Sequence, residues 1–201
     1  MGIIEDAVTQ LEKTIEGTGC EEGAVTLRRN PDEVTCQYEH GVCIEALYGG
    51  RSGEFVTTDP VEATTKISFL FGASLSNKTA KSAACTVINV IAAFLCISRK
   101  VRACPPSAHP PCLLRLKEHI GGRQVFLVGD CPILRRELGA QVTDDPASAG
   151  VLIINNEGLL QDGTEEIFAA TGRDREILCI GPSLSGVADL NCLERFCPYG
   201  T

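Results

Sequence analysis

The spacing of apolar positions divides the chain into two unlike parts. In residues 3–16 apolar side chains recur every three or four positions, which predicts an amphipathic helix ending at Gly17-Thr18-Gly19. Strand-like segments follow at 24–28, 33–38 and 41–47, with turns rich in Asn, Pro, Asp and Gly between them. We therefore expect an antiparallel meander after the first helix.

The middle of the chain predicts one more strand and a long helix. Residues 66–71 predict the strand, and residues 79 to about 97 predict the helix. The uncharged run 82–98 is slightly too short for a membrane span and holds several small and polar residues, so we expect a buried helix. Four prolines in residues 104–111 predict a linker, followed by a short helix over 112–119.

Beyond the linker the strands are continuously apolar. Residues 124–128, 150–154 and 176–180 each lack polar alternation, and each is followed by a glycine-containing loop. Helices are predicted up to Leu138 and over 164–171. Apolar strands that alternate with helices are typical of a parallel sheet covered on both faces, as in a Rossmann-like half.

The predicted fold class is therefore α/β, with an N-terminal α+β domain packed on a small Rossmann-like parallel-sheet domain. We place the first domain at 1–103, the proline-rich linker and short helix at 104–120, and the second domain at 121–201.

Composition and charge exclude several classes. Apolar residues make up 44% of the 201 residues and charged residues 22%, so a folded core is expected. A net charge of −8 argues against nucleic acid as a partner, and no segment predicts a membrane anchor. The 11 cysteines, without a secretory signal, indicate reduced thiols and a cytoplasmic protein; a homodimer is left open.

Three loops follow the apolar strands, at the edge where parallel sheets bind ligands. Each loop combines glycine with a small polar side chain, and neither a dinucleotide fingerprint nor a Walker motif is present. Ordinary turns are the alternative for each loop taken singly. The predicted ligand-binding residues in these loops are Gly129, Asp130, Asn155, Asn156, Glu157, Gly181, Pro182 and Ser183.

A second candidate site is basic. Residues 63–117 contain no acidic side chain but eight basic ones, and part of this stretch leads the long helix. Lysines at a helix start are unfavourable unless an anion is bound there. We therefore predict that Asn77, Lys78 and Lys81 face an anionic ligand, with a solvated lysine pair beside a helix cap as the alternative.

The cysteines show no spacing typical of a metal site. Cys85, Cys96 and Cys179 lie in apolar segments and are predicted to be buried. Cys131 precedes a short helix, where a lowered thiol pKa is expected, so it is the candidate metal ligand. The other candidate metal ligands are in loops, at Cys104 with His109 and Cys112, and at Cys192 with Cys197. No nucleophile–base pair is evident, so catalytic residues stay unknown.

The second half also resembles a known family. The strand ending in Val128-Gly129, the Gly163-Thr164 helix start and the strand ending in Gly181-Pro182-Ser183 resemble the family described as heavy-metal chelation domains, whose function is not established. The helix around Val87-Ile88-Asn89 is similar to one in the same family, and Asn155-Asn156-Glu157 departs from its usual Thr-Gly-rich turn.

This resemblance implies an N-terminal domain like that of enolase, a ligand cleft between the domains, and a link to metal or corrinoid-related metabolism in anaerobes. The first functional hypothesis is a protein that binds a metal ion, or an anionic, metal-bearing small molecule, in that cleft. The second is a small transferase-like enzyme that uses Asp130, Cys131 or Glu157, and the third is a regulatory or structural protein. The cofactor is unknown, with a metal ion as the class considered.

Overall fold

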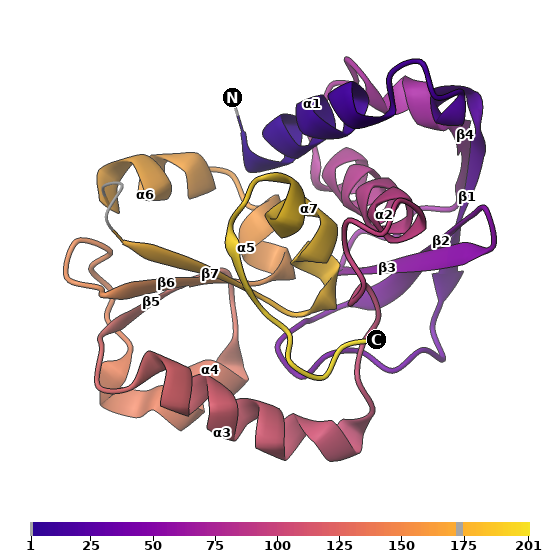
Figure 1. The fold of residues 1–201 in the computed structure, drawn as a ribbon. Helices are drawn as coiled ribbons and strands as arrows, with labels where there is room; N and C mark the ends of the chain where they lie inside the picture. Colours follow the sequence, from indigo (N-terminus) through magenta and orange to yellow (C-terminus); the bar gives the residue numbers. More distant parts are fainter. Residues whose placement is uncertain (1, 172–174) are drawn as a thin grey trace.

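The computed structural model describes residues 2–171 and 175–201 and contains two separate sheets (Figure 1). The first sheet is antiparallel, with the strand order β3-β2-β1-β4, and the second is parallel, with the order β5-β6-β7-β8. The fold class is therefore the predicted α/β arrangement. The strands are β1 (Ala24–Asn30), β2 (Val42–Tyr48), β3 (Arg51–Thr57), β4 (Ala63–Lys66), β5 (Val125–Val128), β6 (Val151–Ile154), β7 (Glu176–Ile180) and β8 (Glu194–Phe196).

Helices cover both sheets (Figure 1). The long helix α2 packs on the antiparallel sheet and also against α7, so it lies between the two halves. The α-helices are α1 (Ile3–Ile15), α2 (Lys78–Phe94), α3 (His109–Ile120), α4 (Pro132–Leu138), α5 (Asn156–Leu160), α6 (Thr164–Thr171) and α7 (Ser185–Leu190). No described helix has the length and apolar character needed to cross a membrane.

The parallel sheet is buried on both faces, as its continuous apolar strands predict. In β6, Val151 and Ile153 pack with α3 and α4, whereas Leu152 and Ile154 pack with the core that includes α2 and α7. Successive side chains of a strand point to opposite faces, so an unbroken apolar run is what a doubly covered strand requires.

Two predicted strands are wrong. Residues 33–38 contain no strand, and the antiparallel pairing is instead completed by β3, which the two-glycine turn Gly49-Gly50 joins to β2. Both glycines have positive φ (55° and 76°), the requirement of a tight hairpin turn. Of residues 66–71 only Lys66 is in a strand, and Ile67–Leu70 form a 3₁₀ turn.

The proline-rich stretch, which was predicted to be a linker without helix, contains the start of a helix. Pro110 and Pro111 lie in the first turn of α3, where a missing backbone N–H costs no helical hydrogen bond. Pro106 likewise begins a 3₁₀ turn. The position of the domain boundary at 104–120 stays a prediction.

Candidate functional site

A segment of the first half crosses the edge of the parallel sheet where a ligand was expected. We call residues 36–40 the crossing segment. The backbone oxygen of Tyr38 accepts a hydrogen bond from Asn155 Nδ2 at 3.1 Å, and that of His40 accepts one from Asn156 Nδ2 at 3.0 Å. Glu39 Oε1 accepts a hydrogen bond from the backbone N–H of Ser183 at 2.9 Å. The crossing segment thus contacts the loops at Asn155–Asn156 and Ser183 through these bonds, and it contacts the third predicted loop through the thiol of Cys131.

The predicted loop side chains mostly bind protein groups. Asn155, Asn156 and Ser183 are at most 2% exposed. Asn155 Oδ1 accepts from the N–H of Gly158, and Ser183 Oγ accepts from the N–H of Val56 at 2.9 Å. These three residues therefore join the two halves, which leaves few of their atoms free for a small molecule.

The glycines of these loops, which lack a Cβ, leave space that other side chains of the protein occupy. Gly181 has φ +89°, and a Cβ there would lie 2.3 Å from Glu39 Oε1. Gly129 has φ +95°, and its Cβ would lie 2.2 Å from Asn155 Oδ1. The close approach that was predicted for a ligand is made by Glu39 and Asn155. Pro182 is buried beside Gly181.

Glu39 is the residue of this edge that the sequence did not single out. It is 8% exposed, and its Oε2 has no hydrogen-bond partner among the described residues. Burial raises the pKa of its carboxyl group to about 8, against the opposing hydrogen bond from Ser183. A buried carboxyl group with a displaced pKa is a functional-site candidate. The local sequence gives no signal, because its burial depends on a loop 144 positions away.

A cavity of about 310 Å³ lies beside the crossing segment. Residues 37–40 line one side of this cavity, and Asp130, Cys131 and the start of α4 line the other. The structure therefore brings two of the predicted residues, Asp130 and Cys131, together with Glu39 and His40. Glu157 lies nearby, with its Oε1 at 3.5 Å from His40 Nδ1.

The expected activation of Cys131 is wrong. Burial raises the pKa of its thiol to about 11, and this effect outweighs the hydrogen bond from the N–H of Leu134. The thiol contacts the backbone oxygen of Tyr38 at 3.8 Å. All eleven cysteines are free thiols. Cys85 and Cys179 are buried as predicted, whereas Cys96 is exposed because α2 ends at Phe94.

The predicted basic helix start lies at a different cavity, of about 260 Å³. Lys81 lines it, and its Nζ lies 3.1 Å from Asp162 Oδ1. Asn77 caps α2 by accepting from the N–H of Ala80, and Lys78 is exposed. Glu5 and Glu166 also line this cavity, so its acidic groups outnumber Lys81. The charge of this cavity adds no support to the predicted anion site, which stays a prediction.

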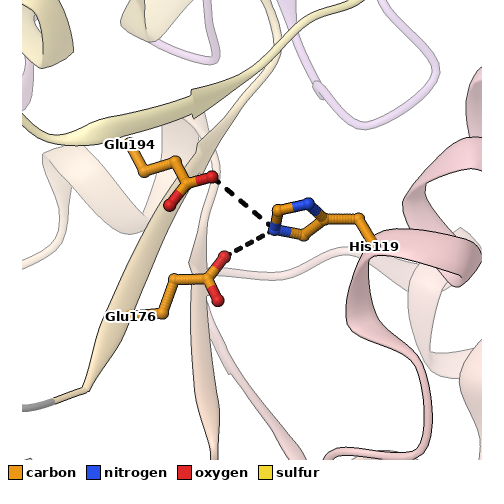
Figure 2. A group of neighbouring side chains, drawn as sticks. All are labelled: His119, Glu176 and Glu194. Carbon is orange, nitrogen blue, oxygen red and sulfur yellow. Dashed lines mark hydrogen bonds and ion pairs between the residues drawn. The ribbon is translucent and has the colours of Figure 1, made fainter.

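Three possible metal ligands meet at the opposite end of the parallel sheet (Figure 2). Among the described residues, His119, Glu176 and Glu194 form the one group of His, Cys, Asp or Glu whose three ligand atoms lie within 4.8 Å of one another. His119 Nε2 is 2.6 Å from Glu176 Oε1 and 3.8 Å from Glu194 Oε1. This group could hold a metal ion.

The fold explains why these three side chains converge. Glu176 and Glu194 are the first residues of the adjacent parallel strands β7 and β8, and Glu194 pairs with Leu178, two positions after Glu176. Both glutamates therefore point to the face covered by α3, whose last turn carries His119. Glu176 lies 57 positions and Glu194 lies 75 positions after His119 in the chain, so no motif of fixed spacing could reveal the group.

Arg123 orients one of the carboxylates. Its guanidinium binds the second oxygen of Glu176 and is itself held by the backbone oxygens of His119 and Ile120 at 2.7 and 2.9 Å. Burial alone would raise the pKa of Glu176, but the hydrogen bonds from His119 and Arg123 outweigh burial and lower it. Glu176 is therefore held in its ionised form, and one of its carboxylate oxygens points to His119.

The comparisons with known proteins give a fold and no activity. No family model and no curated protein matches the chain. Among solved structures, the chain is similar to the crystal structure of a protein of unknown function from the DUF364 family of Pyrococcus horikoshii. The TM-score is 0.53 at 10% sequence identity, over 90% of this chain and 79% of that one. At this identity the likeness shows the fold alone.

Proposed function

We propose that this protein binds a divalent transition-metal ion through His119, Glu176 and Glu194. The observation that carries the proposal is the convergence of one imidazole nitrogen and two carboxylate oxygens from three separate elements. One histidine with two carboxylates is a donor set that suits zinc and other divalent first-row transition metals. Three protein ligands leave one coordination position of a tetrahedral ion open.

The separations between the ligand atoms fit an ion after small rotations. In a tetrahedral site with bonds of about 2.1 Å, the ligand atoms lie about 3.4 Å apart. His119 Nε2 must move away from Glu176 and towards Glu194, whose side chain is 54% exposed and free to turn. The positive charge of Arg123 opposes the ion, so we expect moderate affinity.

Titration of the reduced full-length chain with Co²⁺ tests the proposal. We expect one equivalent to bind without the charge-transfer absorption typical of thiolate ligands, and His119→Ala with Glu194→Gln to weaken that binding at least tenfold. Glu12→Gln, which removes one exposed carboxylate from α1 and so makes the same change in net charge, is the matched control and should leave it unchanged. Equal Co²⁺ binding by the double variant would exclude this site, and thiolate absorption from the bound equivalent would assign the metal to the cysteines instead.

The cavity between the crossing segment and α4 supports a second candidate function. Glu39, with its unpartnered buried oxygen, lies beside Asp130 and Cys131 there. We infer a site for a small metal-bearing or anionic molecule in this cavity. The other predicted loop residues, Gly129, Asn155, Asn156, Gly181, Pro182 and Ser183, are not among the residues that line it. The alternative is a small transferase-like enzyme that uses the same cavity. The volume of about 310 Å³ suits a small metabolite.

Native mass spectrometry of freshly isolated protein tests this second candidate. We expect added mass that Asp130→Ala reduces and Asp144→Ala, on an exposed loop, does not. If the bound molecule is converted on incubation and Asp130→Ala stops the conversion, the enzyme alternative is favoured over simple binding. Protein of the bare chain mass under native conditions would contradict both versions. A cytoplasmic location and a homodimer stay proposals beside it.

A further inference from the structure

The largest cavity described here lies beside the end of α2, away from the sites proposed above. It has a volume of about 600 Å³ and lies between the β2–β3 turn, the end of α2 and residues 98–102. Arg51, Arg99 and Arg102 line it together with Thr201, and none of the described Asp or Glu side chains does. Two of these arginines come from the acid-free stretch of residues 63–117.

The three arginines differ in how much charge is already neutralised. Arg102 Nε lies 2.7 Å from Glu54 Oε1, and its Nη2 lies 3.4 Å from Glu33 Oε1, so this guanidinium is held in place by carboxylates. Arg51 and Arg99 are exposed and make no ion pair to the described residues. Two free guanidinium groups therefore face one cavity.

A buried hydroxyl adds a second observation. Ser98 lines the same cavity and is 1% exposed, and its Oγ has no hydrogen-bond partner among the described residues. Buried hydroxyl groups are normally satisfied, so an unpaired one beside a cavity indicates a missing partner. Near the end of α2, the N–H groups of Ile97 and Ser98 both donate to Ala92 O, and that of Cys96 donates to Ala93 O. Backbone groups therefore already bond these two carbonyls.

We propose that this cavity binds a small phosphate-bearing molecule through Arg51 and Arg99, with Ser98 as an additional donor. A guanidinium donates two parallel hydrogen bonds to a phosphate, and two of them balance the charge of a phosphate monoester. The volume lies within the usual range of small-molecule sites. This site shares no lining residue with the metal group or with the cavity at Asp130.

Calorimetric titration of the reduced full-length chain with inorganic pyrophosphate tests the proposal. We expect saturable binding that Arg51→Glu with Arg99→Glu weakens at least tenfold. The matched control, Arg29→Glu with Arg135→Glu, makes the same change in net charge on exposed arginines elsewhere and should alter binding less than twofold. Because a charge reversal can disturb folding, Arg51→Ala with Arg99→Ala is measured beside it, with circular dichroism as the check.

Ser98→Ala refines the test. We expect it to weaken pyrophosphate binding about threefold to tenfold, because one donor is lost and the arginines remain. An equal loss in both double charge variants would show that only net charge matters and would overturn the proposal. Wild-type protein without saturable binding would overturn it as well.

Discussion

Glu39 is a carboxyl group that the fold holds largely protonated at neutral pH. Its pKa is raised to about 8, mainly by burial and to a smaller extent by the nearby carboxylate of Glu54. In the unfolded chain the same group ionises near its ordinary value of about 4.5. Between these two values the folded state binds a proton that the unfolded state has lost, so the free energy of unfolding falls as pH rises.

We therefore expect Glu39→Gln to flatten the pH dependence of stability. The wild-type protein loses up to a few kcal/mol of this contribution between about pH 4.5 and pH 8, whereas an amide does not ionise. Urea unfolding at pH 5, 6, 7 and 8 measures the difference. Glu12→Gln, on the exposed face of α1, is the control and should follow the wild type. Parallel curves for wild type and Glu39→Gln would contradict the assigned pKa.

The residues of both candidate sites were only partly predictable. Asp130 and Cys131 follow an apolar strand, and this position alone predicts the carboxyl end of a parallel sheet. Glu39, His119 and Glu194 carry no such signal, because each acquires its neighbours from segments far away in the chain. The raised thiol pKa of Cys131 was missed because burial, which the sequence does not show, outweighs the helix N-terminus.

At the scale of the elements, α2 holds the two halves together through one polar side chain. Asn89 is fully buried, and its Nδ2 donates to the backbone oxygens of Glu54 at 2.7 Å and Ser183 at 2.8 Å. Its Oδ1 accepts from the N–H of Gly186 at 2.8 Å. One amide thus satisfies backbone groups of β3 and of the Ser183 loop at once.

Replacing Asn89 by Leu should destabilise the protein by about 3–5 kcal/mol, because each buried backbone group left unpaired costs about 1–3 kcal/mol. Asn77→Ala, which removes the exposed cap of the same helix, should cost only about 1 kcal/mol. Chemical denaturation of both variants gives the comparison. Similar losses for the two would show that Asn89 does not join the halves energetically.

The elements that were predicted correctly are those whose pattern reflects their own burial. Strands β5, β6 and β7 and helix α6 fall where the apolar runs and periodicity place them. Residues 33–38 alternate like a strand, yet Cys36 and Tyr38 bury themselves against α3 and α4 instead of a sheet neighbour. Alternation shows that a segment has a buried side, but it does not show which surface covers that side.

At the scale of the whole molecule, one hydrophobic core crosses the predicted boundary between domains. It contains residues of α1, β1–β3 and α2 together with residues of β5–β7, α5 and α7. Further backbone pairing joins Arg102 with Thr201, and Asn191 binds the backbone oxygen of Ile3. The two halves therefore differ in sheet type but share their interior.

Fragments divided at 103/104 should not fold separately. The piece 104–201 would expose Leu184 and Val187 and leave the N–H of Ser183 without its carboxylate partner. We expect neither fragment to show a cooperative urea transition, and a mixture of the two to recover helical circular dichroism. A sharp transition for 104–201 alone would instead support an independent domain beginning near the predicted linker.

During synthesis, the crossing segment is made long before the last loop that it contacts. Glu39 and Ser183 lie 144 positions apart, which takes a ribosome roughly 7–30 seconds to traverse at common elongation rates. Throughout that interval the carboxyl group of Glu39 lacks the Ser183 N–H that later binds it. The edge of the parallel sheet can therefore be completed only when synthesis of the chain is almost finished.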